Sequence, residues 1–152
     1  MLIYKRLSGE NGHEAGRQLL AQLYHQATGA PLPPICVTER GKPYLTDSKW
    51  HFSISHTKNH VFCALSRRPV GIDAEEMDRQ IDPKLAQRIL SPSEAARFDG
   101  SREMLLRFWV LKEAYAKLTG RGLGNYLQQT DLRPETVEQI DGCFVAVLEE
   151  KP

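Results

Sequence analysis

Runs of hydrophobic residues predict β-strands along three closely spaced stretches in the first half of the chain. In residues 51–56, HFSISH, Phe52 and Ile54 point to one side and the two serines point to the other. Residues 60–66, HVFCALS, form a continuous apolar run typical of a buried strand, and residues 70–75, VGIDAE, alternate again. Because the connecting turns are short, we expect these strands to form an antiparallel meander. Further strands are predicted over residues 2–6 and 143–150.

Apolar residues recur at helical spacing in two longer segments. Residues 12–27 predict a helix with Asn11 as its N-terminal cap. Residues 101–120, SREMLLRFWVLKEAYAKLTG, predict a stronger helix between a serine cap and a terminal glycine. Shorter helices are predicted to begin at the Asp-Pro pair 82–83 and the Ser-Pro pair 91–92, because proline is favoured in the first helical turn.

The composition is that of an ordinary globular domain. The chain has 152 residues, 41% of them hydrophobic and 26% charged, which is enough for one domain or two small lobes with a core. The net charge is +1, from 20 basic and 19 acidic residues, and this argues against a general nucleic-acid binder. No run approaches the roughly 20 apolar residues of a membrane-spanning helix, so no membrane association is expected.

Three widely spaced cysteines bear on the cellular compartment. The chain has an odd number of cysteines and no C-x-x-C motif, so neither a disulfide framework nor a zinc site is predicted from Cys36, Cys63 and Cys143. Cys63 and Cys143 lie in apolar runs, where we expect them to act as small buried hydrophobic residues. The first ten residues lack the apolar segment of a signal peptide, and we therefore expect a protein of the reducing cytoplasm.

Two acidic residues end the third predicted strand. On a strand, Asp73 and Glu75 face the same side, roughly 6.5–7 Å apart along the backbone. They are either a solvated strand end or part of a Mg²⁺ site, in which a few carboxylates share the ion with water and phosphate. A third acid is available in Glu113, which lies opposite the apolar face of the long helix, one turn from Lys117. The same pair is typical of an exposed helix surface, where it contributes only about 0.2–0.5 kcal/mol.

A third stretch is rich in groups that bind anions. Ser55, His56 and Lys58 lie at the end of a predicted strand, and a basic turn, GKP, occupies residues 41–43. A single histidine is more often structural than functional, and a basic turn can be no more than a turn. The H-x-x-x-H spacing of His56 and His60 lacks the cysteine pair of a zinc motif, and no G-x-S-x-G sequence surrounds either serine.

These segments, in this order along the chain, resemble the 4′-phosphopantetheinyl transferase superfamily. The matching segments are GKPYL (41–45), FSISHT (52–57), VGIDAE (70–75) and FWVLKEAYAKLTGRGL (108–123). Before residue 41 the resemblance is thin. There, EAGRQLL (14–20) is similar to a family segment whose arginine helps to bind coenzyme A, and that arginine would be Arg17.

The resemblance implies an activity and a metal site. Enzymes of this family transfer the 4′-phosphopantetheine arm of coenzyme A to a serine of an apo carrier protein and release adenosine 3′,5′-bisphosphate. By similarity, Asp73, Glu75 and Glu113 would be the Mg²⁺ ligands. Glu113 would also accept the proton of the incoming serine, and Lys117 would contact the phosphates. The nucleophile belongs to the partner, which agrees with the absence of an activated serine or cysteine in the chain.

The remaining site residues follow in the same way. The resemblance implies that Ser55 and His56 bind phosphate oxygens of coenzyme A, and that Lys42 and Pro43 lie near its nucleotide end. It also implies an α+β fold in which antiparallel sheets pack with the long helix.

Of the two family types, the two-lobed surfactin-type fits better than the holo-acyl-carrier-protein synthase type, because Asp73 falls in mid-chain. We expect a single transferase domain over residues 1–152, with pseudo-symmetric lobes near 1–75 and 76–152, the second of them shortened. A monomer is expected, with a dimer as the alternative. Two other functions remain open: a Mg²⁺-dependent nuclease, and a module that binds coenzyme A or a carrier protein without catalysis.

Overall fold

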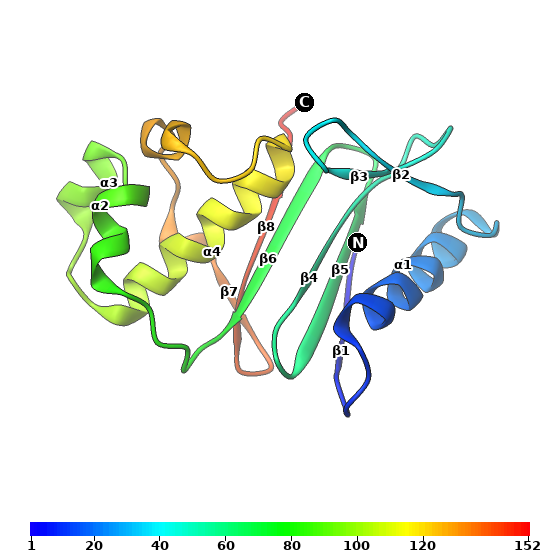
Figure 1. Cartoon of the computed structure of the whole chain (residues 1–152), viewed down its shortest axis with the longest axis horizontal. Coiled ribbons are helices and arrows are strands. Elements are labelled where there is room, and N and C mark those ends of the chain that lie inside the picture. Colours follow the sequence, from blue (N-terminus) through cyan, green and yellow to red (C-terminus); the bar gives the residue numbers. More distant parts are fainter.

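The computed structural model describes all 152 residues as a mixed α+β fold with two three-stranded antiparallel sheets and two long helices (Figure 1). The strands are β1 (Leu2–Arg6), β2 (Ile35–Val37), β3 (Pro43–Leu45), β4 (His51–His56), β5 (His60–Ser66), β6 (Val70–Glu76), β7 (Glu138–Ile140) and β8 (Cys143–Glu149). The helices are α1 (Gly12–Thr28), α2 (Ala86–Ile89), α3 (Pro92–Arg97) and α4 (Arg102–Thr119), with 3₁₀ turns at Pro83–Leu85, Asn125–Gln129 and Pro134–Thr136. The expected fold class, α+β with antiparallel sheets packed with helices, is confirmed.

The first sheet has the strand order β1-β5-β4, and α1 packs on one of its faces. The Asn11 side chain caps α1 by accepting hydrogen bonds from the backbone N–H groups of His13 and Glu14, as the sequence predicted. Leu20 of α1 is fully buried in a cluster that includes Val61 of β5. Alternate residues of β5 therefore face α1.

The second sheet has the strand order β6-β8-β7, and α4 packs on its outer face. On that side, Leu106, Val110 and Ala114 of α4 meet Phe144 of β8. Residues of the opposite face, among them Ile72, join Phe62 and Ala64 of β5 in a cluster between the two sheets. The result is four layers in the order α1, first sheet, second sheet and α4 (Figure 1).

The expected meander is wrong for its third strand. Strands β4 and β5 pair as predicted, but β6 pairs with β8 and lies beside β4 without a backbone ladder. Instead, the N–H of Ile72 donates to Ser53 Oγ at 3.0 Å and the N–H of Ala74 donates to Ser55 Oγ at 3.1 Å. Where the two sheets meet, serine hydroxyls thus accept the hydrogen bonds that strand carbonyls would accept in a ladder. The strand that pairs along the full length of β6 is β8, residues 143–149, far along the chain.

The division into two lobes stays a prediction. The boundary expected near residue 75 falls inside β6, all of which belongs to the second sheet. The cap of α4 at Ser101 and its end at Gly120 lie where the sequence placed them. No helix in the structure combines the length and the apolar character that a membrane span needs.

Candidate active site

Gly71 allows α4 to lie directly on β6. A Cβ atom at this position would lie 2.0 Å from the carbonyl oxygen of Ala114 and 2.5 Å from the backbone nitrogen of Leu118, so no larger residue fits without moving the helix. This close approach brings Lys117 of α4 against the middle of β6, at Ile72 and Asp73. The glycine of the VGIDAE segment is therefore a packing requirement of the site.

Lys117 joins the two sheets at this point. Its ammonium donates to the carbonyl oxygens of Ile54 at 3.2 Å and Ile72 at 3.0 Å, and to Asp73 Oδ1 at 3.2 Å. The same carboxylate oxygen of Asp73 accepts a hydrogen bond from Ser55 Oγ at 3.2 Å. All three ammonium hydrogens thus have acceptors, and Lys117 holds β4, β6 and the Asp73 carboxylate together.

The three acidic side chains predicted as metal ligands influence one another electrostatically. Burial, opposed by the charge of Lys117 and assisted by the charge of Glu113, raises the pKa of Asp73 to about 6. Burial and the charge of Asp73 raise the pKa of Glu75. Burial, followed by the charge of Glu75 against that of Lys117, raises the pKa of Glu113. Mutual repulsion of this kind is typical of carboxylates arranged for a cation.

The residues present fit a hard divalent cation, with one rearrangement. Oxygen Oδ2 of Asp73 is buried and has no hydrogen-bond partner, which leaves a carboxylate oxygen free for a ligand. Glu75, however, forms an ion pair with Arg79, and the three carboxylates are not gathered within 4.8 Å of one another. Release of Glu75 from Arg79 would allow all three to supply the oxygen ligands that Mg²⁺ prefers.

A cavity of about 480 Å³ opens next to these acids, between α1, the turn before β3, β4 and the C-terminal end of α4. Six of the predicted site residues line it: Arg17, Lys42, Pro43, His56, Glu113 and Lys117. The other three, Ser55, Asp73 and Glu75, are not part of its wall, but Lys117 of the wall contacts Asp73, which accepts a hydrogen bond from Ser55. The structure thus brings nearly all the predicted residues to one place, in two adjoining groups.

The cavity wall is basic. Arg17 makes no ion pair or hydrogen bond within the protein, and the His56 ring lies against Gly12, where an added Cβ would come within 2.8 Å of it. Lys42 Nζ donates to the carbonyl oxygen of Leu118 at 2.5 Å, and burial lowers the pKa of Lys42. Glu113 is the only acidic residue of the lining. Such a wall suits an anionic ligand that carries several phosphate groups.

Two further basic residues of the wall were missed from the sequence. His13 lies four residues before Arg17, on the same face of α1, and Arg40 lies two residues before Lys42 in the basic turn. The helical spacing and the cluster of basic residues around Lys42 were signals that could have found them.

Known proteins resemble this chain in sequence. The family model described as "4′-phosphopantetheinyl transferase superfamily" matches residues 69–143, a range that contains β6 and α4. The chain is 34% identical over 124 residues to a 4′-phosphopantetheinyl transferase of Bacillus subtilis, covering 72% of this chain and 54% of that protein. It is 36% identical over 90 residues to the 4′-phosphopantetheinyl transferase gsp of Aneurinibacillus migulanus, covering 56% and 37%.

A third relative is the 4′-phosphopantetheinyl transferase Sfp of Bacillus subtilis strain 168. The identity is 34% over 128 residues, which is 75% of this chain and 57% of that protein. The chain therefore spans about half the length of the curated relatives that it matches.

Proposed function

The chain belongs to the 4′-phosphopantetheinyl transferase superfamily, and from this premise we propose that it transfers the 4′-phosphopantetheine arm of coenzyme A to a serine of an apo acyl or peptidyl carrier protein. The second product would be adenosine 3′,5′-bisphosphate. The observation that carries the proposal is the basic cavity of about 480 Å³ that adjoins three electrostatically coupled carboxyl groups.

Coenzyme A would bind along the basic wall. Lys42 and Pro43 would contact its nucleotide end, Arg17 and His56 its phosphates. Ser55 is buried and bonded to Asp73, so a contact between Ser55 and phosphate requires a change of hydrogen-bond partner. Arg17 needs no such change because it has no partner within the protein, and it is the strongest candidate for a direct phosphate contact.

In the transfer, the carrier serine oxygen would bond to the phosphorus that bears the pantetheine arm, and the bond from that phosphorus to the bridging oxygen of the diphosphate would break. Glu113 faces the cavity and would take the serine proton, because burial and neighbouring charge hold its pKa above the ordinary value. Lys117 would keep Asp73 in place and supply positive charge beside the leaving phosphate. A Mg²⁺ ion held by Asp73, Glu75 and Glu113 would neutralise charge on the diphosphate oxygens.

Three further assignments belong to this proposal. The partners are coenzyme A and the carrier protein, with no part for nucleic acid or a membrane. The protein acts as a monomer, which light scattering coupled to gel filtration measures directly. It acts in the cytoplasm, where its three cysteines remain unpaired thiols.

Transfer is tested by incubating the whole chain with Mg²⁺, coenzyme A and an apo carrier protein, followed by mass spectrometry of the carrier. We expect a mass increase equal to one phosphopantetheine arm. Glu113→Gln should abolish the product and leave the thermal unfolding curve nearly unchanged. Glu103→Gln, on the exposed first turn of the same helix, is the matched control and should retain activity.

The ion pair between Glu75 and Arg79 gives weight to one competing function. With Glu75 held by Arg79 and the three carboxylates not gathered, the protein would bind coenzyme A or a carrier protein without transferring anything. Calorimetric binding of coenzyme A without a mass shift of the carrier would support that function and refute transfer. A Mg²⁺-dependent nuclease would produce neither result and would instead degrade a nucleic-acid substrate.

A further inference from the structure

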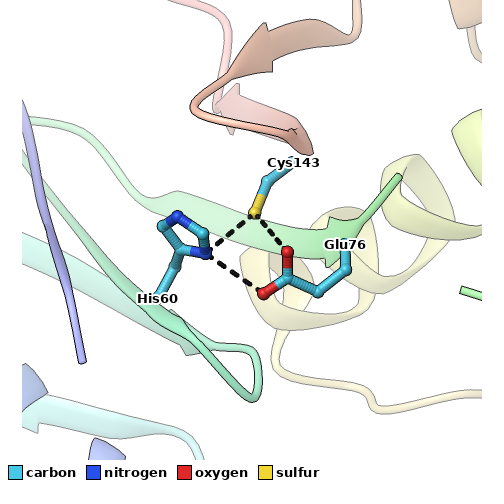
Figure 2. A group of neighbouring side chains, drawn as sticks. All are labelled: His60, Glu76 and Cys143. Atoms are coloured by element: carbon cyan, nitrogen blue, oxygen red, sulfur yellow. Dashed lines mark hydrogen bonds and ion pairs between the residues drawn. The ribbon is translucent and has the colours of Figure 1, made fainter. Parts of the chain in front are cut away.

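A second cluster of reactive side chains lies between the two sheets, outside the candidate active site. His60 of β5, Glu76 of β6 and Cys143 of β8 point toward one another (Figure 2). Glu76 and Cys143 are direct partners in the β6–β8 ladder, so their side chains share one face of the second sheet. Asp73 and Glu75 belong to the opposite face, next to α4, because side chains alternate along a strand.

The three donor atoms have the spacing of a metal coordination shell. His60 Nδ1 lies 3.1 Å from Glu76 Oε1 and 3.4 Å from Cys143 Sγ, and Cys143 Sγ lies 3.6 Å from Glu76 Oε2. With Zn²⁺ bonds of about 2.0 Å to oxygen and nitrogen and about 2.3 Å to sulfur, tetrahedral ligands are separated by roughly 3.3–3.6 Å. Only small movements separate the side chains from that geometry.

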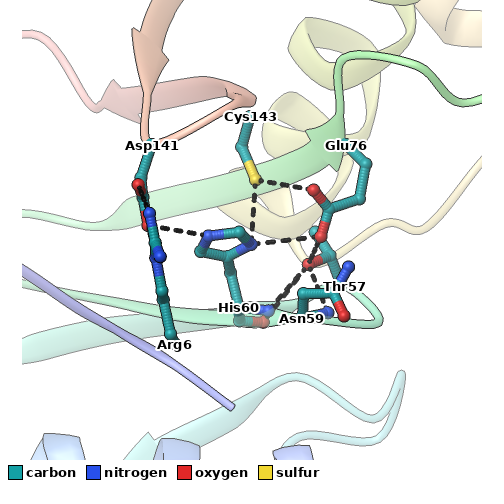
Figure 3. Close-up of polar contacts among 7 residues, drawn as sticks. All are labelled: Arg6, Thr57, Asn59, His60, Glu76, Asp141 and Cys143. Carbon is teal, nitrogen blue, oxygen red and sulfur yellow. Dashed lines mark hydrogen bonds and ion pairs between the residues drawn. The ribbon is translucent and has the colours of Figure 1, made fainter. Parts of the chain in front are cut away.

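The histidine is oriented from behind by a carboxylate. His60 Nε2 lies 2.9 Å from Asp141 Oδ2, and Asp141 is held by two hydrogen bonds from Arg6, at 2.6 Å from Nε and 2.5 Å from Nη2 (Figure 3). Asp141 occupies the tight turn between β7 and β8 with a positive φ of 51°. A carboxylate that accepts the second ring N–H of a histidine is the usual outer partner of metal-binding imidazole, because it fixes the ring and its tautomer.

The glutamate is positioned in the same way. Thr57 Oγ1 donates a hydrogen bond to Glu76 Oε1 at 2.7 Å, and the backbone N–H of His60 donates to Thr57 Oγ1 at 3.0 Å. The cluster is nearly closed to solvent, since Cys143 is fully buried and His60 is 6% exposed. The Glu76 side chain is 22% exposed and provides the side from which an ion can enter.

We propose that His60 Nδ1, the Glu76 carboxylate and Cys143 Sγ form a binding site for a divalent transition metal of the Zn²⁺ type, with water as the fourth ligand. Binding displaces the thiol proton of Cys143, and any proton on Nδ1 of His60, to solvent. The ion joins β5 of the first sheet to β6 and β8 of the second. The site is separate from the proposed transfer reaction and needs no coenzyme A.

No zinc site was predicted from the sequence, because each ligand comes from a different strand and no two are close in the chain. The competing interpretation is a purely hydrogen-bonded cross-link, in which a protonated His60 lies between the carboxylates of Glu76 and Asp141. The metal site and the hydrogen-bonded cross-link differ in one respect that can be measured. Only in the metal site is the Cys143 thiolate bonded to a cation.

The test is a Co²⁺ titration of the whole chain in excess Mg²⁺, which occupies carboxylate sites but has little affinity for a thiolate. We expect a thiolate-to-Co²⁺ absorption band in the near ultraviolet that saturates at one Co²⁺ per chain and disappears when Zn²⁺ is added. Zn²⁺ should also raise the melting temperature, since it binds only the folded state. A wild-type chain without the band overturns the proposal and leaves the hydrogen-bonded cross-link.

Variants assign the ligands. Cys143→Ser should lose the band, whereas Cys36→Ser, at an exposed cysteine, and Cys63→Ala, in the core beneath α1, should keep it. A band that persists in Cys143→Ser overturns the assignment. Asp141→Asn keeps a residue that tolerates positive φ and should weaken Co²⁺ binding about 10–100-fold. If Cys143→Ser does not fold, Glu76→Gln takes its place, and unchanged Co²⁺ affinity in that variant overturns the proposal.

Discussion

Lys112 is the residue whose replacement should disturb the fold most sharply without touching the cavity. Its side chain is fully buried, and Nζ lies 2.6 Å from Glu94 Oε1, which is also fully buried. Nζ donates two more hydrogen bonds, to the carbonyl oxygens of Leu127 and Thr130 at 2.7 Å each. One ammonium therefore joins α4 to α3 and to the 3₁₀ turn Asn125–Gln129 with the residue that follows it.

Lys112→Met removes the cation but leaves its partners in place. The Glu94 carboxylate would keep only the backbone N–H groups of Ser91 and Leu132, at 2.8 and 2.7 Å, and the carbonyl oxygens of Leu127 and Thr130 would each lose the ammonium as a donor. Removal of one member of a buried ion pair costs about 3–5 kcal/mol, because the remaining charge is uncompensated. At about 2–4 °C per kcal/mol for a chain of this size, the melting temperature should fall by roughly 6–20 °C.

The assay is urea unfolding of Lys112→Met, Glu94→Gln and the double variant, at one pH and without metal. The double variant should recover much of the loss, because it buries no unpaired charge. Lys84→Met, at an exposed lysine, is the control and should change stability by less than about 0.5 kcal/mol. A loss below about 1 kcal/mol for Lys112→Met, or a double variant less stable than the sum of the singles, would refute the reasoning.

The remaining predictions concern the site. Gly71→Ala should lower the free energy of unfolding by about 1–3 kcal/mol or more and reduce transfer, because the added Cβ meets the backbone of α4. Gly124→Ala is the control and should be nearly neutral in urea unfolding, because its added Cβ would meet only the Tyr126 ring, at 3.5 Å. The affinity for Mg²⁺, measured by calorimetry, should fall by up to tenfold per pH unit below a pH of about 6. The pKa of Asp73 is raised to about 6, so a proton on this carboxyl group competes with the ion. An affinity that stays constant from pH 5 to 8 would contradict this prediction. Without metal, the raised pKa of Asp73 makes the folded protein more stable at low pH. The contribution of protonated Asp73 to the free energy of unfolding is fully present below the unfolded pKa of 3.8 and is lost as the pH rises through about 6, which unfolding curves at several pH values measure. Arg17→Gln should weaken coenzyme A binding about tenfold at unchanged stability, since Arg17 has no partner within the protein, whereas Arg68→Gln, on the exposed turn after β5, should bind normally.

Local chemistry was predictable from sequence alone. The caps of α1 and α4 and the proline starts near residues 83 and 92 all lie where the sequence placed them. Each of these features depends only on residues within one or two turns of the chain, so the local sequence is sufficient to predict it. The candidate site residues came instead from segments that resemble a known family, and their roles stay predictions.

Pairing between distant segments was not predictable. The short turn before β6 is compatible with pairing to β5, yet β6 pairs with β8 about 70 residues later. Likewise, the sequence singled out Lys117 as a site residue but did not predict that Lys112, five residues earlier on the same helix, is buried with Glu94. Their roles depend on what packs against each side of α4.

The amino-acid sequence by itself determined the helices, most strand positions and the identity of the acidic and basic groups available for chemistry. Only the tertiary structure decided which groups meet: Asp73 of β6 with Lys117 of α4, and His60 with Glu76 and Cys143 from three strands. The physical reason is that a cap or a turn is formed by neighbours in the chain. A charge cluster, in contrast, exists only after burial of apolar surface has brought distant strands together.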